Sequence, residues 1–107
     1  MERACVAFNI KPGSKKEYVK RHNEIWPELV DLIRKYGFSN QTIFINNNLV
    51  IAYLECSGDY LTQAEKYGKE ELSIAWQEYF NDIIIEDSSL NDEGGRYTSF
   101  EEVWHLD

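Results

Sequence analysis

The sequence predicts a single α+β domain in which helices cover one face of an antiparallel sheet, and three observations support this fold class. A length of 107 residues leaves room for one hydrophobic core, so residues 1–107 are expected to form one domain. Hydrophobic residues make up 43% of the chain and aromatic residues 14%, which is typical of a folded protein. The apolar pattern switches between strand and helix periods in the order β-α-β-β-α-β.

The first third of the chain predicts a strand followed by an interrupted helix. Apolar residues alternate over Arg3–Ile10, which predicts a strand. Ser14-x-x-Glu17 matches a capping box, and helical spacing then continues to Tyr36. Pro27 lacks the N–H that a helix interior requires. We therefore expect a kink or break near residues 23–26, with Pro27 opening a second helical segment.

The middle of the chain predicts a hairpin and a short helix. Asn40–Ile45 and Leu49–Cys56 have strand composition, and the three asparagines at 46–48 favour a tight turn between them. Ser57-Gly58-Asp59 predicts the start of a short helix that ends at Gly68.

The last third predicts a longer helix, a polar loop and a final strand. Glu70–Ile84 has an apolar stripe at helical spacing, residues 86–96 are polar and contain two glycines, and Tyr97–Leu106 has strand character. The complete order is that of the ferredoxin-like split βαβ unit. That fold is an antiparallel sheet with its helices on one face.

The predicted central strands are apolar on both faces, as in the run over residues 49–54. Helices can cover only one face of such a sheet, and the other would leave a large apolar patch in water. A homodimer that packs sheet on sheet is the simplest remedy, so we expect a homodimer.

Charge and cysteine content bound the partners and the compartment. A formal net charge of −8 would be repelled by nucleic acid and by an anionic membrane, so neither is expected as a partner. No secretory leader and no membrane-spanning run is expected. Cys5 and Cys56 are expected to be reduced thiols, which fits a cytoplasmic protein. Two cysteines and two histidines so far apart in the sequence predict no metal site.

A tyrosine and a histidine stand out on the predicted first helix. Tyr18 and His22 share the helical face of Ile25 and Leu29, which are ordinary core residue types. Two readings of His22 are open at this point. It is either a core histidine satisfied by a neighbouring carbonyl, or a group that transfers protons near neutral pH.

The predicted topology can bring further polar and aromatic residues to the same pocket. Gln41 begins the second strand, and Trp76 and Gln77 lie on the last helix. Aromatic rings stack on the C–H face of a sugar ring, and glutamine amides both donate to and accept from hydroxyls. These residue types suit a neutral polyol, although each of the three also has an ordinary structural explanation.

The residues themselves resemble those of the L-rhamnose mutarotase family. The resemblance begins with Tyr18-x-x-Arg21-His22-Asn23-x-Ile25-Trp26-Pro27-Glu28-Leu29 and spans essentially the whole chain. It continues through Gly37, Asn40-x-x-Ile43-Phe44, Ala52-Tyr53-Leu54-Glu55, Trp76 and Glu102-Val103-Trp104-His105-Leu106. It implies a ferredoxin-like dimeric α/β barrel without a cofactor.

The resemblance also implies roles for the residues of the pocket. His22 would be the acid/base residue, and Tyr18, Gln41, Trp76 and Gln77 would contact a monosaccharide. The rhamnose enzymes carry a tyrosine in place of Gln41 and a second tryptophan in place of Gln77. Two rings are thus exchanged for two amides, which leaves L-fucose as an alternative substrate.

The implied reaction interconverts the α and β anomers of a 6-deoxy-L-sugar, most simply L-rhamnose, by acid/base-assisted ring opening and closure. We expect His22 to serve one oxygen and Tyr18 or a bound water the other. Two other classes remain as alternatives, namely a cofactor-free monooxygenase with the same barrel fold and a sugar-binding module without catalysis.

Overall fold

The computed structural model describes residues 1–86 and 96–107, which form a four-stranded sheet and four helices. In chain order the elements are β1 (Glu2–Asn9), α1 (Lys15–Asn23), α2 (Pro27–Lys35), β2 (Phe38–Asn46), β3 (Leu49–Cys56), α3 (Tyr60–Gly68), α4 (Glu71–Tyr79) and β4 (Thr98–Phe100). The strand order is β2-β3-β1-β4 with every pair antiparallel. The predicted α+β fold with ferredoxin-like topology is therefore confirmed.

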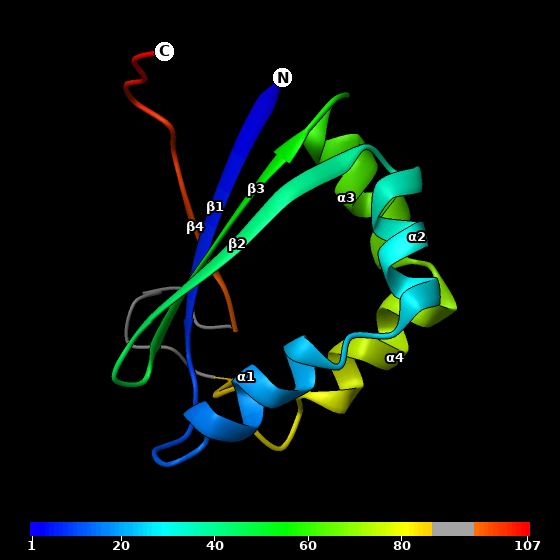
Figure 1. Ribbon diagram of the computed structural model, residues 1–107. Coiled ribbons are helices and arrows are strands. Elements are labelled where there is room, and N and C mark those ends of the chain that lie inside the picture. Colours follow the sequence, from blue (N-terminus) through cyan, green and yellow to red (C-terminus); the bar gives the residue numbers. More distant parts are fainter. Residues whose placement is uncertain (87–95) are drawn as a thin grey trace.

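All four helices lie on one side of the sheet (Figure 1). The strand register places Val6, Ile43, Ala52 and Ser99 in one row across the sheet. This row faces the helices, because its members line a cavity that helical residues also line. The main buried cluster gathers residues from strands and helices, namely Phe8, Ile10, Tyr18, Val50, Phe80, Ile83 and Ile84.

The predicted helix break is confirmed. α1 ends at Asn23, and Pro27 occupies the first turn of α2, where its missing N–H costs nothing. Gly37 follows α2 with a φ of 86°, in the left-handed region that glycine adopts freely. A side chain there would also collide with Ser57, since a Cβ atom would lie 2.5 Å from the Ser57 Oγ.

Three predicted details are wrong. Ser14 precedes α1, but its Oγ donates to the Lys11 carbonyl at 2.5 Å, so no side-chain cap forms. α4 ends at Tyr79 rather than Ile84, because the chain turns at Phe80 to bring Ile84 beside Ile10.

The last predicted strand is also shorter than expected. Only Thr98–Phe100 pairs with β1. Beyond Phe100 the chain is joined to β1 through the Arg3 side chain, which donates to Glu102 at 3.2 Å, rather than through the backbone. The predicted loop over residues 86–96 lies outside the described residues except at its two ends.

A bulge in β2 changes which side chains face the helices. Ser39 pairs with Glu55 and Thr42 with Tyr53, so β2 contains one residue more than β3 between these pairs. Asn40 absorbs the extra residue with a φ of 51°. Phe38 before the bulge and Gln41 after it therefore both face the helices, although they are three residues apart.

Among the described residues, no helix has the length and apolar character needed to cross a membrane.

Candidate active site

A cavity of about 400 Å³ lies between the sheet and the helices. Its lining includes all five residues that the sequence predicted for the site, namely Tyr18, His22, Gln41, Trp76 and Gln77. They come from α1, β2 and α4, so the fold brings together residues that are up to 59 positions apart in the sequence (77 minus 18). The size lies within the range typical of small-molecule sites.

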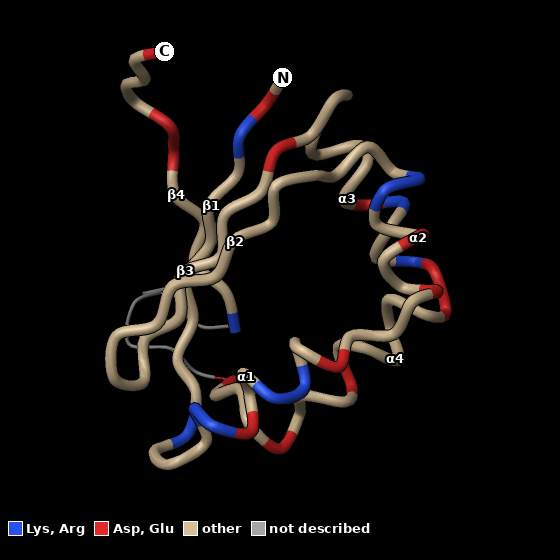
Figure 2. Tube along the Cα trace, in the orientation of Figure 1, with Lys and Arg blue, Asp and Glu red and all other residues tan. Residues whose placement is uncertain are grey.

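The cavity wall carries no formal charge among the described residues. Its apolar part comes from the sheet, the helices and the segments that follow them, including Val6, Phe8, Ile25, Ile33, Leu54 and Ile84. Its polar part consists of phenols, amides, hydroxyls and one imidazole. Lysine, arginine, aspartate and glutamate instead lie along the helices and near the chain ends (Figure 2). Such a wall suits a neutral ligand with both C–H surface and hydroxyl groups.

His22 is oriented by its own helix. Its Nδ1 lies 3.0 Å from the Tyr18 carbonyl oxygen, one turn earlier. A carbonyl only accepts, so Nδ1 carries the proton and the neutral ring keeps Nε2 as its basic nitrogen. Burial lowers the pKa of His22, and the bond to the Tyr18 carbonyl partly offsets this. The two interpretations of His22, a satisfied core histidine and a proton-transfer group, are therefore compatible, because the imidazole is bonded to a carbonyl and also lines the cavity.

Tyr18 is buried directly beside the imidazole. Its side chain is 3% exposed, and its ring centroid lies 4.5 Å from that of His22. Burial raises the pKa of the Tyr18 phenol well above its ordinary value. The phenol therefore remains protonated at neutral pH and can donate a hydrogen bond.

Trp76 supplies an aromatic wall. Its ring meets His22 edge-on at 5.3 Å and Phe80 at 4.9 Å between centroids. Trp26, which precedes α2, packs against Trp76 at 5.0 Å. The helix break thus places Trp26 where it supports the indole of α4.

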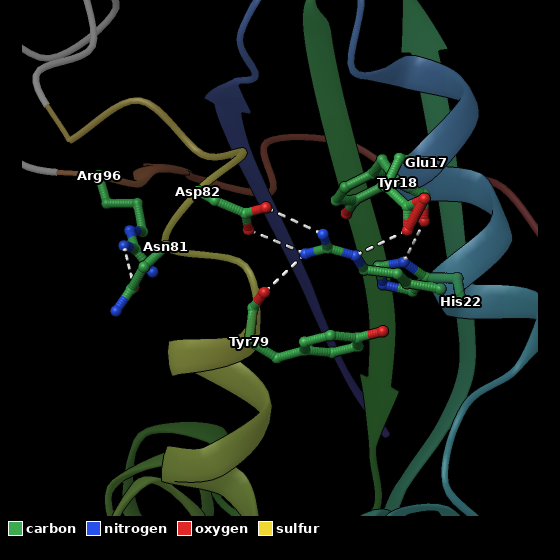
Figure 3. Close-up of polar contacts among 8 residues, drawn as sticks. Glu17, Tyr18, His22, Tyr79, Asn81, Asp82 and Arg96 are labelled. Carbon is green, nitrogen blue, oxygen red and sulfur yellow. Dashed lines mark hydrogen bonds and ion pairs between the residues drawn. The ribbon is translucent and has the colours of Figure 1, made fainter.

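Arg21 ties α1 to the end of α4, a contact that the sequence alone did not predict. Its guanidinium donates to both oxygens of Asp82 at 2.9 Å and to the Tyr79 carbonyl at 2.6 Å (Figure 3). It also donates to Glu17 at 3.0 Å and lies 4.4 Å from the centre of the Tyr79 ring. Because Arg21 precedes His22, this contact fixes the imidazole relative to Trp76. The motif Arg21-His22-Asn23 was the signal that could have revealed it.

Tyr97 lines the cavity, although no motif in the sequence pointed to it. Its hydroxyl donates to Gln77 Oε1 at 2.7 Å, and its ring meets Phe8 edge-on at 5.1 Å. Tyr97 lies two residues before Ser99, which faces the cavity, so strand alternation gave a signal for its side.

Within the part of the chain that the structure describes, no group of three or more His, Cys, Asp or Glu side chains is arranged to hold a metal ion. Cys5 and Cys56 are both free thiols.

Known proteins similar to this chain are L-rhamnose mutarotases. A family model described as L-rhamnose mutarotase matches residues 3–106. The L-rhamnose mutarotase of Lachnoclostridium phytofermentans is 33% identical over 109 residues, which cover 100% of both chains. That of Tolumonas auensis is 35% identical over 86 residues, covering 78% of this chain and 81% of the relative. A crystal structure of an L-rhamnose mutarotase from Formosa agariphila matches with a TM-score of 0.79 at 28% identity, covering 100% of both chains.

Proposed function

The chain belongs to the L-rhamnose mutarotase family and is thus an enzyme of the isomerase class, and we propose that it interconverts the α and β anomers of L-rhamnose with His22 as its acid/base residue. One observation carries this proposal. The histidine, the tyrosine, the tryptophan and the two glutamines that the sequence singled out all line one uncharged cavity. Membership of this family does not support L-fucose as the preferred substrate, and it does not support a monooxygenase or a binding module without catalysis.

Anomer exchange requires only proton transfers and one reversible bond cleavage. The proton of the anomeric hydroxyl leaves, the bond between C1 and the ring oxygen breaks, and the ring oxygen gains a proton. Rotation about the bond between C1 and C2 followed by reclosure gives the other anomer. Positioned proton transfer typically accelerates such a step by about 10²- to 10⁴-fold.

His22 is suited to serve one of the two oxygens. Its Nδ1 is held by the Tyr18 carbonyl, so Nε2 is the atom that takes and returns the proton. Its lowered pKa keeps the imidazole neutral, and therefore basic, at pH 7. The Tyr18 phenol stays protonated and donates to the second oxygen, directly or through a bound water.

The remaining predicted residues hold the sugar. Trp76 offers an indole face for the C–H side of the ring, while Gln41 and Gln77 offer amides for its hydroxyls. Holding the open-chain form between these walls lowers the entropic cost of reaching the geometry from which the ring closes again.

The sheet face opposite the helices supports the proposal of a homodimer. Phe44, Ile51 and Ala7 form one row across it, and Tyr53, Cys5 and Phe100 form the next. Phe44 is 62% exposed and Phe100 50%. A second copy that packs its own sheet face against these rows would remove their exposed side chains, Phe44 and Phe100 above all, from water. The two free thiols support a cytoplasmic location.

The decisive test measures anomer exchange of L-rhamnose by saturation-transfer NMR, with L-fucose, D-galactose and D-glucose for comparison. The enzyme should exchange L-rhamnose fastest. His22→Asn should lower the catalysed rate by about 10²- to 10⁴-fold, because the amide can still donate to the Tyr18 carbonyl but cannot accept a proton.

The matched control is His105→Asn, which replaces the chain's other histidine outside the cavity and should keep the wild-type rate. A folded His22→Asn protein with full activity would refute the acid/base assignment. Wild-type protein that exchanges no sugar of the panel would refute the function.

A further inference from the structure

A line of hydrogen bonds leads from the start of β4 to the cavity. The Arg96 guanidinium donates to Asn81 Oδ1 at 2.7 Å (Figure 3). It also donates to the Glu86 carboxylate. The side chain of Arg96 is only 12% exposed, so these contacts hold it in place. Next in the chain, Tyr97 donates to Gln77 Oε1 at 2.7 Å.

The donors and acceptors of this line run in one direction. An arginine has donors and no acceptor, so where it bonds to a phenol the phenol oxygen must accept. Arg96 bonds to Tyr97 in this way, which opposes the effect of burial, the main cause of the raised pKa of Tyr97. The phenol keeps its own O–H to donate, and that O–H goes to Gln77 Oε1.

This direction decides what Gln77 presents to a ligand. A free glutamine amide can turn over and offer either its oxygen or its nitrogen. With Oε1 held by Tyr97, the Nε2 hydrogens are the groups left for the cavity. A carboxamide that already accepts at oxygen is also a stronger donor at nitrogen, because bonds in a chain polarise one another.

We propose that Tyr97 is a positioning residue that fixes Gln77 as a hydrogen-bond donor to one hydroxyl oxygen of the sugar, so that this pair sets which 6-deoxy-L-hexose is preferred. The inference rests on the proposed mutarotase function. A donor in a fixed place distinguishes epimers, since inverting one carbon moves that hydroxyl oxygen away from Nε2. The indole at the neighbouring Trp76 gives no such selection, because a ring face accepts any C–H surface.

The test compares Tyr97→Phe, Gln77→Leu and the double variant. Each is assayed by saturation-transfer NMR on L-rhamnose and on its three epimers inverted singly at C2, C3 and C4. Gln77→Leu should raise KM for L-rhamnose about three- to tenfold with kcat nearly unchanged, as expected for a lost neutral hydrogen bond. Gln77→Leu should also lower the ratio of kcat/KM for L-rhamnose to kcat/KM for one of the three epimers, more than it lowers this ratio for the other two.

Tyr97→Phe should act in the same direction and on the same epimer, because it releases the Gln77 amide. The double variant should be no worse than Gln77→Leu alone, since Tyr97 acts only through Gln77. Tyr36→Phe is the matched control. It also removes a phenol that donates to a side chain, Glu70 at 3.0 Å, but it lies outside the cavity and should leave all four rates unchanged.

Additive effects in the double variant would overturn the inference, as would an equal loss on all four sugars or a loss confined to kcat. These results leave the mutarotase function standing if wild-type protein exchanges L-rhamnose anomers. A wild-type protein without any exchange would overturn the function, and this inference with it.

Discussion

At the scale of single residues, the environment of His22 sets its chemistry. Three aromatic rings surround the imidazole, with centroids at 4.5 Å for Tyr18, 5.1 Å for Phe80 and 5.3 Å for Trp76. No carboxylate lines the cavity among the described residues, so nothing there compensates for burial of a positive charge. The site therefore favours the neutral, basic form of the ring.

The pH dependence of exchange follows from this environment. Because the pKa of His22 is lowered from its ordinary value of 6.5, the catalysed rate should stay high at pH 6.5 and fall only in more acidic solution. The measurement is the exchange rate of L-rhamnose anomers between about pH 5 and pH 8, with the uncatalysed rate subtracted. An acid limb with its midpoint above 6.5 would contradict the expected shift.

The free energy of unfolding should also decrease in acidic solution. The unfolded chain binds a proton at His22 at higher pH than the folded chain, so this residue stabilises the fold above pH 6.5. That contribution is lost as the pH falls from 6.5 toward the lowered pKa of the folded state. His22→Asn should flatten this part of the dependence of Tm on pH.

At the scale of elements, the contact between α1 and the end of α4 aligns the site. The last carbonyls of a helix lack partners within it, and Arg21 supplies a cation and a donor for the Tyr79 carbonyl of α4. The same guanidinium is bidentate with Asp82, just beyond that helix. One side chain on α1 thus links the helix that carries His22 to the end of the helix that carries Trp76.

Arg21→Lys should therefore weaken catalysis without touching the cavity. A lysine keeps the charge but loses the planar fork that reaches Asp82 and the Tyr79 carbonyl together. We expect Tm to fall by several degrees and kcat/KM to fall by up to about 10²-fold, as small displacements of catalytic groups can cause. Thermal denaturation and saturation-transfer NMR measure the two effects.

Arg34→Lys is the control, because it makes the same exchange on the exposed surface of α2 and should change neither quantity. Wild-type values for Arg21→Lys would show that α1 and α4 are aligned by packing alone.

The sequence predicted the elements because local signals determine them, and the family resemblance named five residues that the fold brings to one cavity. Strand alternation, Pro27 and the turn residues favour their local structures without help from distant contacts. The missed details depend on contacts distant in the sequence. Arg21 and Tyr79 are 58 positions apart, and the end of α4 is set by the return of Ile84 to Ile10. The role of Tyr97 likewise depends on where α4 places Gln77.

At the scale of the whole molecule, the two faces of the sheet serve different purposes. The face toward the helices lines the cavity, and the opposite face carries the rows of Phe44 and Tyr53 (Figure 1). The four helices together hold seven basic and six acidic residues, so the net charge of −8 comes from the rest of the chain. The rows of Phe44 and Tyr53 contain no charged residue, and on the next row of this face Arg3 lies opposite Glu55 and donates to Glu102, so opposite charges are paired. This face can therefore pair with a copy of itself without strong repulsion.

Phe44→Lys should separate such a pair. Light scattering coupled to size-exclusion chromatography should give about twice the chain mass of 12.6 kDa for wild-type protein, and the single chain mass for the variant. A buried, unpaired lysine at the sheet interface explains the expected dissociation. Leu61→Lys, at a residue of α3 that is 76% exposed, should leave the mass unchanged. Wild-type protein with the mass of one chain would refute the homodimer.

The bulge at Asn40 gives β2 one place where its length can change without loss of the cavity wall. If that residue were lost, Ser39 would stay opposite Glu55 and Thr42 opposite Tyr53, so regular alternation would return with Gln41 and Ile43 still facing the helices. A deletion within the regular stretch after the bulge would instead turn part of the strand over. Evolution can therefore shorten β2 at the bulge and keep Gln41 in the cavity, where substitution can change the sugar preference.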